Sequence, residues 1–123
     1  MSQTAAQRIS ALFGLLAVAL GAFGAHALKA TLAEHQTAAI WETAVFYHMT
    51  HAILMFALAS FPNFRRGAWI CFAVGVAIFS GSLYILGVSG VRSWGMVTPF
   101  GGLGLLIGWL ILLWPAKRSS VGP

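Results

Sequence analysis

Three histidines in apolar surroundings are the residues of this chain best suited to chemistry. His26 closes the first apolar stretch, and His48 and His51 lie in the second. Because residues at i and i+3 are neighbours on a helix surface, His48 and His51 are expected to point to the same side. Glu42 lies about two turns before His48, and Tyr84 lies in the third apolar stretch. These five side chains are therefore expected to lie near one another and form the candidate ligand-binding region.

The chemistry open to this set ranges from metal binding to helix packing. Imidazole is the commonest metal ligand, so two or three histidines with Glu42 could hold zinc, copper or haem iron. The same groups could hydrogen-bond a quinone or a lipid headgroup, or could simply join helices to one another. Ser80, Ser82 and Thr98 add polar groups at the same expected depth. Packing is the favoured interpretation, and the sequence names neither a metal nor a cofactor.

No catalytic signature accompanies the histidines. The chain contains none of the HExxH, CxxC, GxSxG or P-loop patterns. His48 or His51 could act as a general base, but no nucleophile pairs convincingly with either. Cys71 is the only cysteine, so neither an internal disulfide nor a multi-cysteine metal site is expected. An enzyme is therefore less favoured than a structural, accessory or ligand-binding protein.

The composition of the chain is typical of a membrane protein. Of its 123 residues, 59% are hydrophobic and 7% are charged, whereas a soluble domain carries about a quarter charged residues. The net charge of +5 comes from scattered Lys and Arg, without the basic stripe typical of nucleic-acid binding. We therefore expect a single membrane domain over residues 1–123, in contact with the lipid bilayer and not with nucleic acid.

Four apolar stretches are long enough to cross a bilayer, which takes about 20 residues. They cover about residues 9–28, 43–61, 68–88 and 96–114, and none contains Asp, Glu, Lys or Arg. The sequence therefore predicts an all-α membrane protein, an antiparallel bundle of four transmembrane helices. Because no carboxylate or arginine inside a span marks an ion pathway, transport is a less favoured function.

The positive charges predict the orientation in the membrane. Lys and Arg accumulate on the cytoplasmic side, and most of them lie on the side of the two termini and the second loop. These are Arg8, Arg65, Arg66, Lys117 and Arg118, against Lys29 and Arg92 on the other side. Both termini are therefore predicted to be cytoplasmic. The alternative for the first stretch is a signal peptide cleaved after Ala27, which would leave the side of the C-terminus unchanged.

Small residues predict where the helices approach closely, because lipid provides no hydrophobic drive for helix association. Gly21 and Ala25 share a face of the first span, and Gly104 and Gly108 share a face of the fourth. In the first outer loop, residues 31–41 could form a short helix in the membrane interface. Trp41 would then lie at the level of the lipid headgroups, as Trp usually prefers.

Several strings of residues resemble a known family. They are residues 21–28 (GAFGAHAL), 41–48 (WETAVFYH), 51–52, 80–84 and 98–102. With these strings the chain resembles, over nearly its whole length, the YgdD-like family of small membrane proteins. The resemblance implies a multi-pass protein of the bacterial inner membrane, of unknown function, with no assigned catalytic residues. It argues against cleavage after Ala27, which would separate the first string from the rest.

The resemblance and the residues together favour a structural or accessory protein. A partner subunit in a larger membrane complex or a homo-oligomer is the expected form. The alternative is binding of a small ligand, lipid or metal among His26, His48, His51 and Tyr84. His48 departs from the family pattern, in which an amide such as Gln is expected. A metal site that requires His48 would therefore not be a general property of the family.

Overall fold

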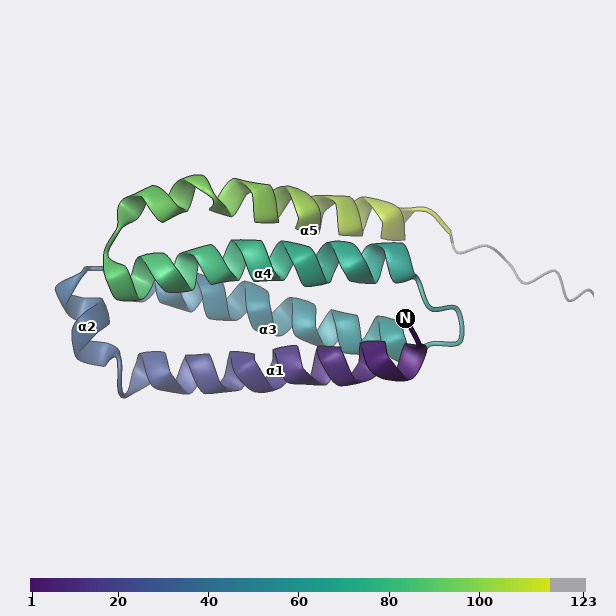
Figure 1. Ribbon diagram of the computed structural model, residues 1–123, viewed down its shortest axis with the longest axis horizontal. Helices are drawn as coiled ribbons and strands as arrows, with labels where there is room; N and C mark the ends of the chain where they lie inside the picture. Colours follow the sequence, from purple (N-terminus) through teal and green to yellow (C-terminus); the bar gives the residue numbers. More distant parts are fainter. Residues whose placement is uncertain (116–123) are drawn as a thin grey trace, which may run out of the picture.

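The computed structural model of the chain describes residues 1–115, which form helices and no strands. The elements are α1 (Gln3–Ala25), α2 (Lys29–Glu34), α3 (Ala38–Ser60), α4 (Arg66–Ser89), the 3-10 helix η1 (Arg92–Met96) and α5 (Thr98–Leu113). Four helical segments in this part of the chain are long and apolar enough to cross a membrane. They run side by side with short connections at alternating ends, which confirms the predicted all-α bundle (Figure 1). Lys117 and Arg118, which entered the orientation argument, lie outside the described residues.

Two helices begin earlier than their apolar stretches suggest, because polar residues cap or anchor them. The Ser2 hydroxyl accepts a hydrogen bond from the Ala5 amide at 3.0 Å, so α1 begins at Gln3. The Thr37 hydroxyl donates to the Gly87 carbonyl at 2.7 Å, which fixes the start of α3 against α4. Each helix of about 23 residues therefore extends beyond the roughly 30 Å hydrocarbon layer.

The expectation for the first outer loop was wrong in two respects. The short helix is α2, which ends at Glu34, and Trp41 belongs to the membrane-spanning helix α3. The Trp41 side chain is buried rather than placed among lipid headgroups, and its indole N–H donates to the Leu20 carbonyl of α1 at 2.9 Å. Trp41 therefore joins two helices, because a Trp N–H that is buried needs an acceptor within the protein.

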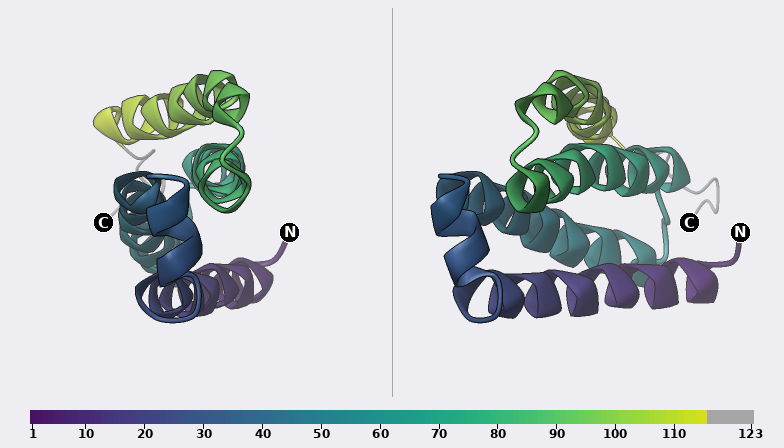
Figure 2. Two further views of the ribbon diagram at one scale, coloured as in Figure 1. Left: turned by 90° about the vertical axis from the view of Figure 1, so that its left-hand side faces the viewer. Right: turned by 60° about the vertical axis from the view of Figure 1, so that its left-hand side comes forward.

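The four long helices form a folded row in which each packs mainly on its neighbour, in the order α1, α3, α4, α5. Seen from the end, the row bends between successive helices (Figure 2). No Cα atom of α1 comes within 8 Å of α4 or α5, and none of α3 comes within 8 Å of α5. Only long side chains bridge these non-neighbouring helices. Two grooves lie between these non-neighbouring helices, one between α1 and α4 and one between α3 and α5.

Glycines allow α5 to lie directly against α4. A Cβ atom added at Gly104 would lie 3.2 Å from the Gly75 Cα, and one added at Gly101 would overlap the backbone of Phe79. A Cβ atom added at Gly108 would lie 2.6 Å from the ring of Phe72, which is itself fully buried. These contacts form a close α4–α5 seam, as expected where small residues line a membrane helix interface.

The α1–α3 interface is looser at the small residues singled out from the sequence. A Cβ atom added at Gly21 would lie 3.3 Å from the Val45 side chain, while Ala25 is exposed. The tighter contact is at Gly24, whose surface is covered by the indole of Trp41. The buried Trp41 thus fits where α1 offers a glycine.

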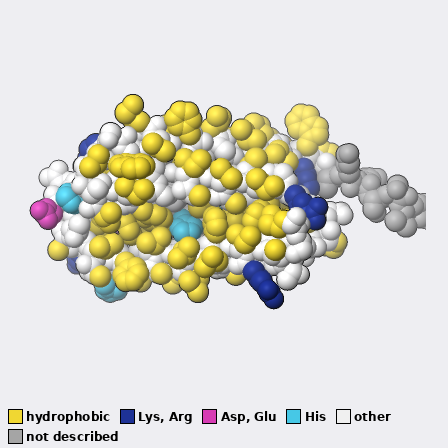
Figure 3. All heavy atoms as spheres, viewed as in Figure 1, with side chains coloured by type: hydrophobic (Ala, Val, Ile, Leu, Met, Phe, Trp, Pro, Cys, Tyr) yellow, Lys and Arg dark blue, Asp and Glu magenta, His cyan; other side chains and the backbone are white. Residues whose placement is uncertain are grey.

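The charged side chains lie at the two ends of the molecule, and hydrophobic side chains cover its middle (Figure 3). At the end that holds the N-terminus and the α3–α4 loop are Arg8, Arg65 and Arg66, with no carboxylate among the described residues. The other end carries both cations and carboxylates, namely Lys29, Arg92, Glu34 and Glu42. An apolar belt between two polar ends is the arrangement that a bilayer requires.

Candidate functional site

His48 lies at the centre of the groove between α1 and α4. Its Nδ1 atom is 2.8 Å from the Tyr84 hydroxyl of α4, and its ring packs against the Phe13 ring of α1. A neutral imidazole has one N–H donor and one acceptor nitrogen. Of these two nitrogens, Nδ1 is engaged with the Tyr84 hydroxyl. His48 on α3 thereby connects the two helices on either side of it.

The α1–α4 groove itself is small and mainly apolar, with a volume of about 220 Å³. Tyr84 also packs on Trp41, with ring centroids 4.7 Å apart, and Phe13 meets the His48 ring edge-on at 6.0 Å. The aromatic rings enclose the hydrogen bond between His48 and Tyr84. Only 6% of His48 is exposed, and it is one of the residues that line this groove.

His51 faces the second groove, between α3 and α5. Its Nδ1 atom lies 2.8 Å from the Tyr47 carbonyl, and the Trp109 indole N–H donates to its Nε2 atom at 3.2 Å. Because Trp109 can only donate, Nε2 must be the unprotonated nitrogen and Nδ1 must carry the proton. Both nitrogens are therefore engaged, and the bond to Trp109 joins helices whose backbones do not meet.

The groove beside His51 is the larger of the two, at about 560 Å³. Tyr47, Phe79 and Trp109 are its aromatic lining, and leucines of α5 complete it. The rings of Tyr47 and Phe79 lie 4.5 Å apart. The groove is open to the surroundings of the protein, because Tyr47 and Trp109 are 37% and 49% exposed.

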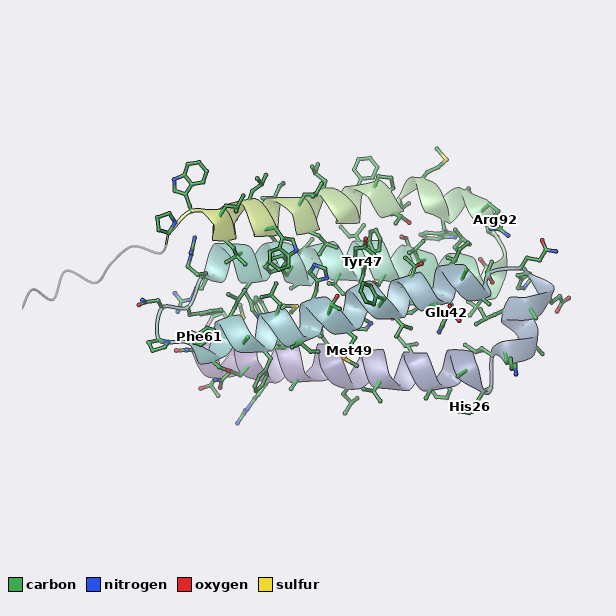
Figure 4. All side chains as sticks on the ribbon, turned by 180° about the vertical axis from the view of Figure 1, so that it is seen from behind. His26, Glu42, Tyr47, Met49, Phe61 and Arg92 are labelled. Atoms are coloured by element: carbon green, nitrogen blue, oxygen red, sulfur yellow. The ribbon has the colours of Figure 1, made fainter. Side chains whose placement is uncertain are left out.

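The five residues predicted to form one region are distributed over several places. The structure brings His48 and Tyr84 together and puts His51 in the other groove, because positions i and i+3 differ by about 60° around a helix axis. His26 is exposed and lies at the end of α1, beside α2 (Figure 4). Tyr47 lies on α3, on the side of that helix toward α4. Glu42 is exposed and lines a third groove with Gly21 and Gly24.

The polar residues near these histidines also find partners. The Ser80 hydroxyl donates to the Ala44 carbonyl at 2.8 Å, and the hydroxyls of Ser82 and Thr98 lie 2.6 Å apart. Within residues 1–115, no buried side-chain nitrogen or oxygen lacks a hydrogen-bond partner. In the same part of the chain, no three His, Cys, Asp or Glu side chains lie close enough to hold a metal ion.

Tryptophans are the residues of these sites that sequence reasoning missed. Trp41 was predicted to lie among lipid headgroups, yet both Trp41 and Trp109 hydrogen-bond to another helix. Trp69 does the same near the opposite end, where its N–H donates to the Ser10 hydroxyl at 2.9 Å. For Trp109 the available signal was depth, since it lies inside its span, where the bilayer offers an indole N–H no acceptor.

Helices of this length, an apolar belt and buried interhelical hydrogen bonds define a small multi-pass integral membrane protein. The chain belongs to the family described as Protein of unknown function (DUF423), whose model matches residues 20–102. The matched range includes His26, His48, His51 and Tyr84 and ends before Trp109. This confirms the resemblance seen in the sequence.

Bacterial membrane proteins resemble the chain over most of its length. The UPF0382 membrane protein YwdK of Bacillus subtilis is 39% identical over 117 residues, covering 89% of this chain and 94% of that protein. The UPF0382 inner membrane protein YgdD of Escherichia coli K12 is 39% identical over 114 residues, covering 89% and 86%. The UPF0382 membrane protein SERP0230 of Staphylococcus epidermidis is 41% identical over 110 residues, covering 85% and 88%. No solved structure matches the chain.

Proposed function

We propose that the protein is a structural or accessory component of the bacterial inner membrane, in which the buried histidines fasten helices together. The observation that carries the proposal is the hydrogen bonding of His51, whose two ring nitrogens are both occupied by groups of this chain. A histidine that acts as a base or a metal ligand directs a free nitrogen at its target. His51 has no nitrogen left for that role.

His48 supports the same role, because its Nδ1 atom is hydrogen-bonded to Tyr84 of α4 and its ring packs against Phe13 of α1. Hydrogen bonds between membrane helices contribute about 0.6 kcal/mol on average and up to about 1.7 kcal/mol. Contributions of this size stabilise a particular arrangement of helices. They matter most where the backbones stay apart, as in α3 and α5.

Replacement of histidine by glutamine keeps a hydrogen-bond donor and an acceptor in the side chain, and such variants test this role in cells. We expect His51→Gln and His48→Gln strains to contain near-normal amounts of the protein. Where deletion changes the levels of other membrane proteins, we expect both variants to return those levels to the wild-type values. Quantitative membrane proteomics of wild-type, deletion and variant strains measures this. A variant that is as abundant and as heat-stable as wild type, yet leaves the proteome in its deletion state, would contradict a packing role.

The proposal includes an orientation with both termini in the cytoplasm. It is supported by the three arginines at the end that holds the N-terminus and by the balanced charge of the other end. Single cysteines in a Cys71→Ala background test it with a membrane-impermeant maleimide on intact spheroplasts. We expect Ser93→Cys to be labelled and Ser2→Cys to be protected until the membrane is opened. The reverse labelling pattern would refute the orientation.

The proposal also includes a protein partner or self-association. It is supported by α1 and α5, which stand at the ends of the row and are mostly exposed. Photocrosslinking from exposed positions on each, such as Leu15 and Leu106, tests this in native membranes. Discrete crosslinked species from either position are expected. Crosslinks to lipid alone from both positions would contradict an accessory role.

A second candidate function is binding of a lipid-soluble small molecule in the α3–α5 groove. It is favoured by the volume of about 560 Å³ and by the aromatic lining of Tyr47, Phe79 and Trp109. The Tyr47 hydroxyl would supply a hydrogen bond without disturbing His51. Extraction and mass spectrometry of protein purified in native-lipid particles test this candidate, with Leu103→Trp as a variant that fills the groove. A molecule present at equal occupancy in both proteins would not be bound there.

A further inference from the structure

Another groove, distinct from those already described, lies at the end of the molecule that carries the arginines. It is a groove of about 560 Å³ between the start of α4 and the end of α5. Its lining includes Asn63, Arg65, Arg66, Gly67 and Trp114, and we call it the basic groove. About half of its surface is polar, whereas the histidine grooves are mainly apolar. The occupant must therefore present polar or charged groups.

Arg65 is held in place at this groove by the chain itself. Its Nη2 atom donates to the Ile111 carbonyl at the end of α5 at 2.7 Å, and the side chain is only partly exposed. A guanidinium has five N–H donors, so one hydrogen bond leaves most of them available. A donor group that is fixed before binding loses less conformational freedom when an anion arrives.

Arg66 provides a second positive charge on the same side. Its guanidinium carbon lies 5.7 Å from the centre of the Phe64 ring, and its side chain is exposed. Two guanidiniums that line the same groove are suited to phosphate, because each can present two parallel N–H donors to its oxygens. No carboxylate lies at this end among the described residues to neutralise them.

The first turn of α4 adds unpaired backbone donors. The Arg66 amide bonds to the Phe64 carbonyl and the Trp69 amide to the Arg65 carbonyl. Within residues 1–115, the amides of Gly67 and Ala68 between them have no such partner, and of these two residues only Gly67 is exposed. No side chain caps the helix. Free N–H groups at a helix start attract anions.

The location of the basic groove identifies which phosphate compound it would meet. Trp114 follows α5 and is 74% exposed, in the position where an indole lies among lipid headgroups. Basic pockets between membrane helices at this level bind anionic lipid headgroups. We propose that the basic groove binds the phosphate headgroup of an anionic phospholipid, with the acyl chains lying along α4 and α5.

Lipid binding to purified protein tests the proposal directly. We expect native mass spectrometry from detergent to detect phosphatidylglycerol retained on the wild type in preference to phosphatidylcholine. Each arginine near a headgroup contributes about a fivefold change in affinity, so Arg65→Gln/Arg66→Gln is expected to lose at least tenfold. The matched control is Lys29→Gln/Arg92→Gln, which removes the same charge at the opposite end. It is expected to retain the lipid as the wild type does.

Two further measurements separate lipid binding from a change of fold and from binding of a soluble phosphate. Because Arg65 also bonds to Ile111, its loss could disturb the fold, and Arg66→Gln alone is then the variant to compare. Equal lipid retention in Arg66→Gln, in the control and in the wild type would overturn the proposal. Displacement of phosphatidylglycerol by millimolar inorganic phosphate would also overturn it, in favour of a soluble phosphate compound. The result does not depend on the roles of His48 and His51.

Discussion

Gly108 offers the sharpest test of how closely α5 packs on α4. A methyl group at this position would lie between 2.6 and 2.9 Å from three ring atoms of Phe72. Ordinary contacts between carbon atoms are about 3.5–4.0 Å, so the ring or the helix must move by nearly 1 Å. Phe72 is fully buried and has little space to move into. Overpacking of this kind costs about 1–3 kcal/mol.

Gly14 provides the matched control for the Gly108→Ala variant. It also lies inside a membrane-spanning helix, but an added Cβ atom there meets nothing within 4 Å. Both substitutions change the helix propensity by a similar amount, of about 0.5–1 kcal/mol. The difference between the two variants therefore isolates the packing cost at Phe72, about 1–3 kcal/mol.

Reversible unfolding in mixed bicelles, by titration with a denaturing detergent, measures both variants. We expect Gly14→Ala to unfold at the same detergent fraction as wild type or above it, and Gly108→Ala clearly below it. If Gly108→Ala matches Gly14→Ala, then Phe72 does not fill the space opposite Gly108. The close α4–α5 seam would in that case be wrong.

Three further experiments test the interhelical hydrogen bonds and the turn at Gly90. A double-mutant cycle of His51→Phe with Trp109→Phe is expected to give a coupling energy of about 0.6–1.7 kcal/mol, and additive effects would show that the bond contributes nothing. Tyr84→Phe is expected to lower the free energy of unfolding by about 1 kcal/mol, with no further loss when His48 is also replaced by Gln; independent losses would contradict their pairing. Gly90 has φ of +71° and touches the His35 ring, so Gly90→Ala is expected to cost at least 1 kcal/mol in bicelle unfolding; an unchanged unfolding midpoint would refute this strain.

The number and type of membrane helices could be predicted from the sequence, because span length and the absence of charge decide them locally. The seam at Gly104 and Gly108 could also be anticipated from their spacing. The folded row could not, since any apolar face of a membrane helix can meet either lipid or protein. Only the contacts of Gly101 and Gly108 with α4 select the face that α5 presents.

The separation of His48 and His51 into two grooves was the least predictable feature. His48 and His51 are near neighbours on α3, but that helix packs against α1 on one side and α4 on another. A rotation of about 60° is then enough to separate their side chains into two grooves. The partner of His51 is Trp109, which is 58 residues away in the sequence. A pattern within one helix contains no information about such a contact.

The most direct test of the account is chemical analysis of protein purified in native-lipid particles, as wild type, His48→Gln and His51→Gln. Metal content, visible spectrum and co-purifying small molecules are measured on each, and circular dichroism checks the fold. The account predicts that no stoichiometric metal, haem or quinone depends on either histidine, and that bound phospholipid is the same in all three. A stoichiometric species that His51→Gln loses while its fold stays intact would contradict the assignment of this histidine to helix packing.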